Sequence, residues 1–146
     1  MKIELAQNPS KQDAKTISDG LVRFNYEAIP DLEPQEAAIS FSIFAHDDVG
    51  KITGGLRASC YWNILHIELV WVSEEARGKN IGSQMIEKAE AFAIENGFER
   101  ALLDTTSWQA RPFYEKLGYE VFGTLPDHPK GHALHFMTKK LIEKAD

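Results

Sequence analysis

The sequence has a single cysteine, Cys60, and no long apolar run. One thiol excludes an internal disulfide, although it leaves the redox compartment open. No stretch approaches the roughly 18–20 apolar residues that a membrane span needs, and the N-terminus lacks the apolar core of a signal peptide. We therefore expect a soluble, cytoplasmic protein with no membrane partner.

Basic residues are also few. The chain has 16 lysines and arginines against 22 acidic residues, a net charge of −6. This balance argues against nucleic acid as a partner, because such binding needs a broad basic face. It does not exclude an anionic cofactor, since Arg77 and Lys79 form a local cationic cluster. An acidic surface elsewhere favours cationic substrates such as amines.

The length and composition are those of one globular domain. The chain has 146 residues, of which 43% are hydrophobic, enough apolar material for one core. No internal repeat or low-complexity segment divides it. We expect a single domain over residues 1–146.

In the first half, hydrophobic periodicity predicts one helix and three strands. Apolar residues at three- and four-residue steps indicate an amphipathic helix from Ser10 to about Ile29. Residues 38–45, 51–61 and 64–72 are strand-like, and the short turns between them predict an antiparallel meander. Trp62 and Trp71 are interpreted as core residues.

The second half predicts helices alternating with strands. The clearest helix covers residues 80–95, and Asn96-Gly97 can end it with a left-handed cap. A strand at 101–105 and a short helix at 109–117 follow, then two closing strands at 119–124 and 134–139. This order predicts an α/β chain of the mixed α+β type, with a mixed sheet covered by helices.

The turn Arg77-Gly78-Lys79-Asn80-Ile81-Gly82 lies between a strand and the longest predicted helix. Unpaired N–H groups at a helix start and the helix dipole together attract anions. Gly82 removes a side chain where a phosphate must come close, and Asn80 tolerates left-handed backbone angles. The turn predicts an anion site, although a solvated connection remains an alternative.

Two motifs in the second half resemble the GCN5-related N-acetyltransferase family. Its signature is R/Q-x-x-G-x-G/A after a strand, then Asn-x-x-Ala-x-x-x-Tyr followed by a Gly-aromatic pair. The matching residues are Arg77, Gly82, Ala110, Tyr114, Gly118 and Tyr119. Asn80 replaces the first glycine of the first motif, and Ser107 replaces the asparagine of the second.

The resemblance implies a fold and a cofactor. It implies a mostly antiparallel sheet of six to seven strands, splayed between the family's fourth and fifth strands. It also implies that acetyl-CoA is the co-substrate, with its pantetheine arm against the fourth strand and its pyrophosphate on the turn. The cofactor-binding residues are then Val70, Trp71, Val72, Arg77, Gly78, Lys79, Asn80, Ile81, Gly82 and Ser107.

The implied activity is acetyl transfer to a primary amine of a small molecule or an exposed protein amine. A catalytically inactive CoA-binding or regulatory module is the alternative. An NAD-dependent oxidoreductase is disfavoured because the G-x-G-x-x-G pattern is absent. Homodimers are common in this family, so the resemblance also suggests a homodimer.

Direct attack on a thioester needs a base for the amine and an acid for the departing thiolate. The family position of Tyr114 makes its phenol the predicted acid. Glu68 is a candidate base because it lies two residues before Val70 on the same strand, which predicts that both face the cofactor. His66 is an equally natural base, and an ordered water is a third. The alternative is that these polar residues mark a solvated strand end or a structural ion pair.

Acceptor-binding residues are expected near the ends of strands and on the first helix. Asp104, His128 and Tyr26 are the predicted contacts. The histidines match no standard zinc-ligand spacing, so no metal is expected.

Overall fold

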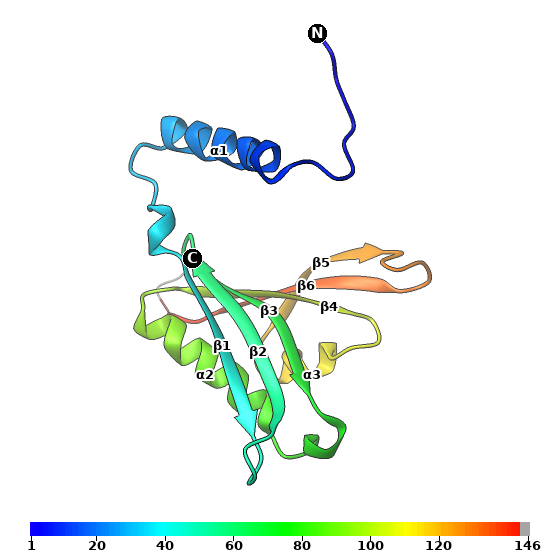
Figure 1. The fold of residues 1–146 in the computed structure, drawn as a ribbon. Coiled ribbons are helices and arrows are strands. Elements are labelled where there is room, and N and C mark those ends of the chain that lie inside the picture. Colours follow the sequence, from blue (N-terminus) through cyan, green and yellow to red (C-terminus); the bar gives the residue numbers. More distant parts are fainter. Residues whose placement is uncertain (144–146) are drawn as a thin grey trace. The chain divides into compact units, whose positions relative to one another are not determined.

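The computed structural model describes residues 1–143. The chain divides into two compact units, Met1–Gln35 and Glu36–Asp146, which are described separately (Figure 1). The single-domain organisation expected from the length stays a prediction.

The first unit contains one long helix, α1 (Lys11–Ala28), as the apolar periodicity predicted. Ser10 caps it, because its hydroxyl accepts the backbone N–H of Asp13 at 3.0 Å. In the last turn of the helix, the Tyr26 hydroxyl donates to the carbonyl oxygen of Glu33 at 2.8 Å. This bond ties the following loop back to the helix within the unit.

The second unit is a six-stranded sheet with helices. In chain order its elements are η1 (Gln35–Ala37), β1 (Ile39–His46), β2 (Ile52–Tyr61), β3 (Ile64–Val72), η2 (Glu74–Ala76), α2 (Ile81–Glu95), β4 (Arg100–Thr106), α3 (Arg111–Lys116), β5 (Glu120–Pro126) and β6 (Ala133–Lys140). The strand order is β1-β2-β3-β4-β6-β5. Each predicted strand and helix is present, with bounds that differ by at most two residues.

The sheet is mixed, and the one parallel pairing within residues 1–143 is short. β1, β2 and β3 form the antiparallel meander. β3 and β4 run parallel but pair only from Ile64–His66 to Arg100–Leu102. β4 instead pairs with β6 along its whole length. The two strands therefore separate after His66, which is the splay that the family resemblance implied.

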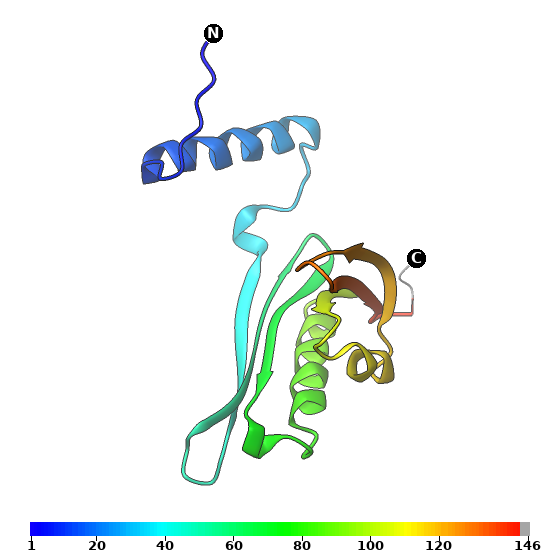
Figure 2. The ribbon, with the colours of Figure 1, turned by 90° about the vertical axis from the view of Figure 1, so that its right-hand side faces the viewer.

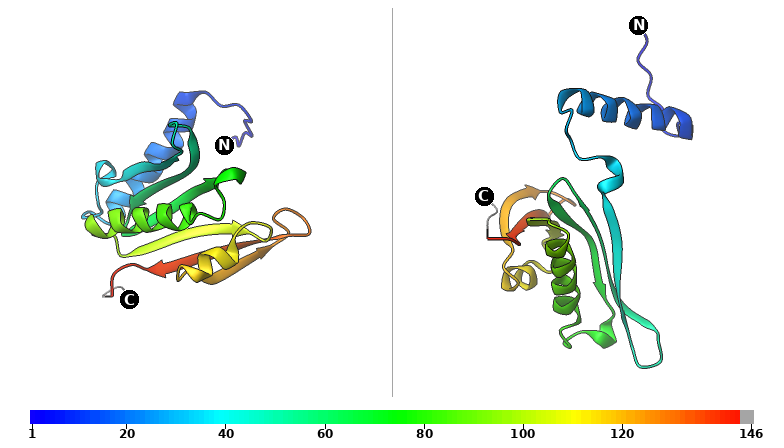
Figure 3. Two further views of the ribbon diagram at one scale, coloured as in Figure 1. Left: turned by 90° about the horizontal axis from the view of Figure 1, so that it is seen from below. Right: turned by 90° about the vertical axis from the view of Figure 1, so that its left-hand side faces the viewer.

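The core lies between α2 and one face of the sheet, called here the inner face. Buried residues of α2, such as Ile86 and Ala89, pack against Leu65 of β3 and Ala101 of β4. Figures 2 and 3 show α2 along this face, with α3 on the same side of the sheet. Burying one stripe of α2 and one face of the sheet explains the two periodicities of the sequence.

A polar network is buried beneath this core. Glu90 of α2 is only 8% exposed. Its carboxylate accepts the Tyr119 hydroxyl at 2.7 Å and the Lys139 ammonium at 2.9 and 3.1 Å. Because all three polar groups are satisfied, the network links α2 to the chain after α3 and to β6 without an unpaired buried charge.

The interpretation of two tryptophans as core residues was wrong. Trp62 and Trp71 are 52% and 55% exposed. Trp62 lies in the β2–β3 turn with a positive φ of 47°, and Trp71 lies on the outer face of β3, away from α2. No helix within residues 1–143 is both long and apolar enough to cross a membrane.

Candidate functional site

The separation of β3 from β4 leaves one edge of β3 open. Beyond His66, β3 keeps its pairing with β2 but has no strand partner on its other side within residues 1–143. The backbone of Val70 and Val72 lies in this segment. An open strand edge presents N–H and C=O groups that an extended ligand with amide groups can pair with.

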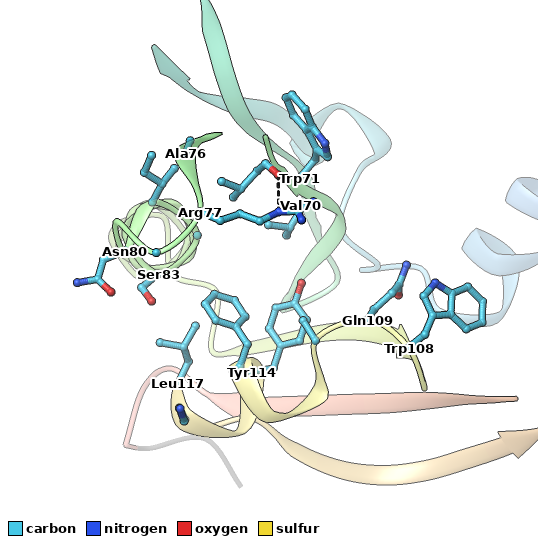
Figure 4. A pocket seen from close by; sticks show the side chains of 17 residues that line it. Val70, Trp71, Ala76, Arg77, Asn80, Ser83, Trp108, Gln109, Tyr114 and Leu117 are labelled. Carbon is cyan, nitrogen blue, oxygen red and sulfur yellow. Dashed lines mark hydrogen bonds between the residues drawn. The ribbon is translucent and has the colours of Figure 1, made fainter. Parts of the chain in front are cut away.

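The predicted turn connects this open edge to α2. Gly78 has a φ of 79°, and Asn80 is left-handed with φ 61° and ψ 20°. α2 then begins at Ile81, so the N–H groups of its first turn lack intrahelical partners. The Arg77 side chain folds back, where Nε donates to the Val72 carbonyl at 3.4 Å (Figure 4).

The left-handed angle at Asn80 explains why asparagine can replace the family's glycine. We expect Asn80→Gly to change the free energy of unfolding by less than about 0.5 kcal/mol, because glycine adopts this angle without strain. Asn80→Val should lose about 1–2 kcal/mol, since a β-branched residue clashes there. Urea denaturation measures both. A valine variant as stable as the wild type would contradict the assigned conformation.

A cavity of about 740 Å³ lies between the open edge, the turn and α3. Its walls come from the end of β3, the start of α2 and the segment from Trp108 through α3 (Figure 4). The lining residues are Val70, Trp71, Val72, Ala76, Arg77, Gly78, Asn80, Ile81, Gly82, Ser83, Trp108, Gln109, Ala110, Phe113, Tyr114, Lys116 and Leu117. The cavity thus brings together the two motifs, which are about 30 residues apart in the sequence.

Tyr114 lies in the middle of the cavity wall. It is 8% exposed, and its ring packs edge-on against Phe113 and Tyr119. Burial raises the pKa of Tyr114 above its ordinary value of 10.0, and the negative charge of Asp104 adds to the effect. The phenol is therefore protonated at neutral pH, which is the form that a proton donor requires.

The prediction that Glu68 shares a face with Val70 was wrong. Arg57 is opposite Leu69 and Ala58 is opposite Ile67, so Glu68 is an extra residue in a β-bulge. A bulge reverses the alternation of side chains that follows it. Val70 packs toward the core, whereas Glu68 lies on the outer face, where its carboxylate accepts Arg57 Nε at 3.0 Å.

His66 lies on the outer face as well, at the last pairing before β3 and β4 separate. Its ring stacks on Tyr61 with centroids 4.3 Å apart. Burial lowers the pKa of His66 below its ordinary 6.5, although the Glu68 carboxylate acts in the opposite direction. The imidazole is thus neutral at neutral pH. Neither His66 nor Glu68 lines the 740 Å³ cavity.

Ser107 is not among the cavity-lining residues either. Its hydroxyl lies 3.2 Å from His132 Nδ1 and accepts the Ala133 N–H at 3.2 Å. Its own N–H donates to the Ala133 carbonyl at 2.8 Å. These bonds join the start of the β4–α3 connection to the β5–β6 hairpin.

The other predicted contacts are spread over the chain. Lys79 lines a neighbouring cavity of about 490 Å³, together with Lys51 and Glu75. Asp104 is exposed on β4 and acts electrostatically on Tyr114. His128 is exposed in the β5–β6 hairpin, and Tyr26 belongs to the first unit. Their roles stay predictions.

Several lining residues were missed by the sequence reasoning. Trp108, Gln109 and Phe113 occupy unspecified positions of the second motif, and Ser83 follows the first motif directly. Only their proximity to Tyr114 and Gly82 in the sequence could have indicated them. For residues 1–143, no group of three His, Cys, Asp or Glu side chains is placed to hold a metal.

Comparison with known proteins gives a consistent result. The model of the acetyltransferase (GNAT) family matches residues 7–119. The blasticidin-S acetyltransferase of Streptomyces morookaense is 36% identical over 102 residues, which cover 69% of this chain and 75% of that protein.

Solved structures that are similar to this chain are also acetyltransferases. A Bacillus cereus acetyltransferase is 34% identical, with a TM-score of 0.81 over 94% of this chain and 97% of that one. An aminoglycoside 6′-N-acetyltransferase complexed with coenzyme A shares the fold at 17% identity, with a TM-score of 0.64 over 95% of this chain and 98% of that one. The family match, these relatives and the splayed sheet together establish that this chain belongs to the acetyltransferase (GNAT) family and is an acyltransferase.

Proposed function

We propose that this acyltransferase moves an acetyl group from acetyl-CoA to a primary amine, by direct attack of the amine on the thioester. The observation that carries the proposal is the cavity that joins the α2 turn, the open edge of β3 and Tyr114. The three features of the cavity suit three parts of an acyl-CoA. The anion site suits the pyrophosphate, the strand edge suits the amides of the pantetheine arm, and the protonated phenol suits the departing thiolate.

The residues of the cavity fit this co-substrate. A Cβ at Gly82 would lie 3.0 Å from the Phe113 ring, so the absence of a side chain keeps this end of the cavity open. The turn N–H groups would hold the pyrophosphate. Arg77 would join them by releasing the Val72 carbonyl, and the edge at Val70 and Val72 would then pair with the pantetheine amides. Acetyl-CoA supplies the acetyl group as an activated thioester.

The chain's own groups would handle the protons. An alkylammonium has a pKa near ~10 and must lose a proton before it attacks. His66, neutral at neutral pH, and the Glu68 carboxylate are the candidate bases on the outer face, with a water as the third. Tyr114 would give its proton to the departing thiolate.

An acyl-cysteine intermediate is disfavoured. Cys60 is fully buried, and burial raises the pKa of its thiol to about 11. A thiol is a poor nucleophile in that state, because the thiolate is the reactive form. Direct attack by the amine is therefore the simpler route.

We propose a cationic acceptor. The chain is acidic overall, and Asp104 brings a negative charge close to Tyr114. The relative from Streptomyces morookaense is named a blasticidin-S acetyltransferase, so blasticidin S belongs in the first panel, beside spermidine, lysine and a peptide with a free N-terminus. A homodimer and a cytoplasmic location stay expectations.

Two measurements test the proposal. Acetyl-CoA and CoA should each raise the melting temperature, whereas NAD should not, because a ligand at about 100 times its Kd adds about 2.7 kcal/mol. Thiol release from acetyl-CoA should then increase with at least one amine of the panel. Absence of stabilisation by either CoA species would refute the cofactor assignment. Stabilisation without thiol release for any amine would favour the inactive binding module.

A further inference from the structure

The carboxamide of Gln109 is fixed by its oxygen. Oε1 accepts the backbone N–H of Thr106 at 2.9 Å and lies 3.4 Å from the donating Thr105 hydroxyl. The oxygen therefore accepts from two donors. This pattern assigns the oxygen and the nitrogen of the carboxamide, since a nitrogen at the same place could not accept these bonds. Nε2 has no protein acceptor within residues 1–143, so its two N–H donors are available.

Gln109 also belongs to the wall of the acyl-CoA cavity. Figure 4 shows Tyr114 between Gln109 and the Asn80–Ser83 region of the turn, so Gln109 lies at the end of the cavity away from the proposed pyrophosphate site. An amide held by its oxygen at that end is a preorganised donor.

Few other side chains can donate at this end. Asn80 and Ser83 lie at the start of α2, and the Arg77 Nε is bonded to the Val72 carbonyl. Tyr114 is assigned to the thiolate, and the Trp108 ring packs edge-on against His132 with centroids 5.0 Å apart. Lys116 also lines the cavity, whereas Ala110 and Phe113, the lining residues just before Tyr114, are apolar. A carbonyl that loses water beside Gln109 could recover a hydrogen bond from the Gln109 donors.

We infer that Gln109, rather than Ser107, donates a hydrogen bond to an amide carbonyl of the pantetheine arm. The inference rests on the proposed acetyl-CoA function. Ser107 occupies the motif position for a cofactor contact, but its hydroxyl is committed to His132 and Ala133 and lies outside the cavity lining. Gln109 is two residues further along the chain and has the free donor.

Gln109→Glu isolates the donor. A glutamate keeps oxygens that accept from Thr106 and Thr105, but it has no N–H. We expect the Kd of CoA, measured by calorimetry, to rise about tenfold or more. The Kd of adenosine 3′,5′-bisphosphate, which lacks the pantetheine arm, should stay within about twofold. The melting temperature of the unliganded protein should stay the same, because both anchoring bonds remain.

Two further variants complete the test. Gln109→Met has a similar length and no donor, and it should weaken CoA binding selectively without an added charge. Ser107→Ala should lower the melting temperature, since it cuts the link to the β5–β6 hairpin, but should keep the Kd of CoA within about twofold.

Three outcomes would overturn the inference. One is unchanged CoA affinity in both Gln109 variants. Another is an equal loss of affinity for CoA and for adenosine 3′,5′-bisphosphate. That result would indicate an effect of the added charge or of a changed fold rather than the loss of a pantetheine contact. The third is a tenfold loss of CoA affinity in Ser107→Ala alone. Failure of the wild type to bind CoA at all would instead refute the proposed function on which the inference rests.

Discussion

Tyr114→Phe is expected to lower kcat by at least about 100-fold while leaving the Kd of acetyl-CoA within about twofold. The ring stays in place between Phe113 and Tyr119, so the cavity keeps its shape and only the proton donor is lost. Steady-state thiol release gives kcat, and calorimetry gives the Kd. The comparison separates a role in the chemical step from a role in binding.

The pH dependence of kcat gives a second test of Tyr114 as the proton donor. Burial, together with Asp104, raises the pKa of Tyr114 above 10.0. The protonated form, which is the proton donor, therefore persists from neutral pH to beyond the usual titration of a tyrosine. We expect no alkaline fall in kcat between pH 7 and 10 that depends on Tyr114. A fall in this range that disappears in Tyr114→Phe would contradict the assigned environment.

Tyr119→Phe is the matched control for the loss of a phenol hydroxyl. The Tyr119 ring is 6.1 Å from the Tyr114 ring, but its hydroxyl is bonded to Glu90. This variant should lower stability while kcat changes little. If both variants lowered kcat equally, packing of the aromatic pair rather than proton donation would explain the result. That outcome would contradict the assignment of Tyr114 as the acid.

Lys139→Met is expected to lower the free energy of unfolding by about 3 kcal/mol. The Lys139 ammonium forms an ion pair with the buried Glu90 carboxylate at 2.9 Å. Removing one partner of a buried ion pair leaves the other charge uncompensated, which costs about 3–5 kcal/mol. The lower end applies because the Lys139 side chain is 27% exposed. Urea denaturation at pH 7 measures the change.

Lys88→Met is the matched control, since Lys88 is exposed on the same helix as Glu90. It should change stability by less than about 0.5 kcal/mol. The double variant Glu90→Gln with Lys139→Met should recover part of the loss, because the buried charge is then removed on both sides. Equal stability of Lys139→Met and Lys88→Met would show that the buried pair contributes little.

The local pattern of the sequence determined the elements and the turn. Period-2 and period-3.6 spacing of apolar residues identified the strands and α2, because each element buries one face. The motif around Arg77 and Gly82 indicated the anion site, because a strand, a glycine-containing turn and a helix start are contiguous in the chain. The family and its splayed sheet followed from the same residues together with Tyr114.

The tertiary structure decided which way individual side chains point. The bulge at Glu68 turned Val70 to the inner face and left Glu68 on the outer face beside Arg57, because one extra residue in a strand reverses all alternation after it. Strand alternation alone could not reveal this, since the insertion is visible only in the register with β2. Trp71 is exposed for a related reason, because it follows the bulge.

Contacts between distant residues were also decided only by the fold. Glu90 and Lys139 are 49 positions apart, and Ser107 and His132 are 25 apart, so no local pattern links them. The second contact commits the motif serine to the β5–β6 hairpin and leaves Gln109 with the free donors. The sequence by itself thus indicated the family, the position of the anion-binding turn and Tyr114 as the candidate acid. The tertiary structure decided the partners of each side chain, because those partners come from segments that only folding brings together.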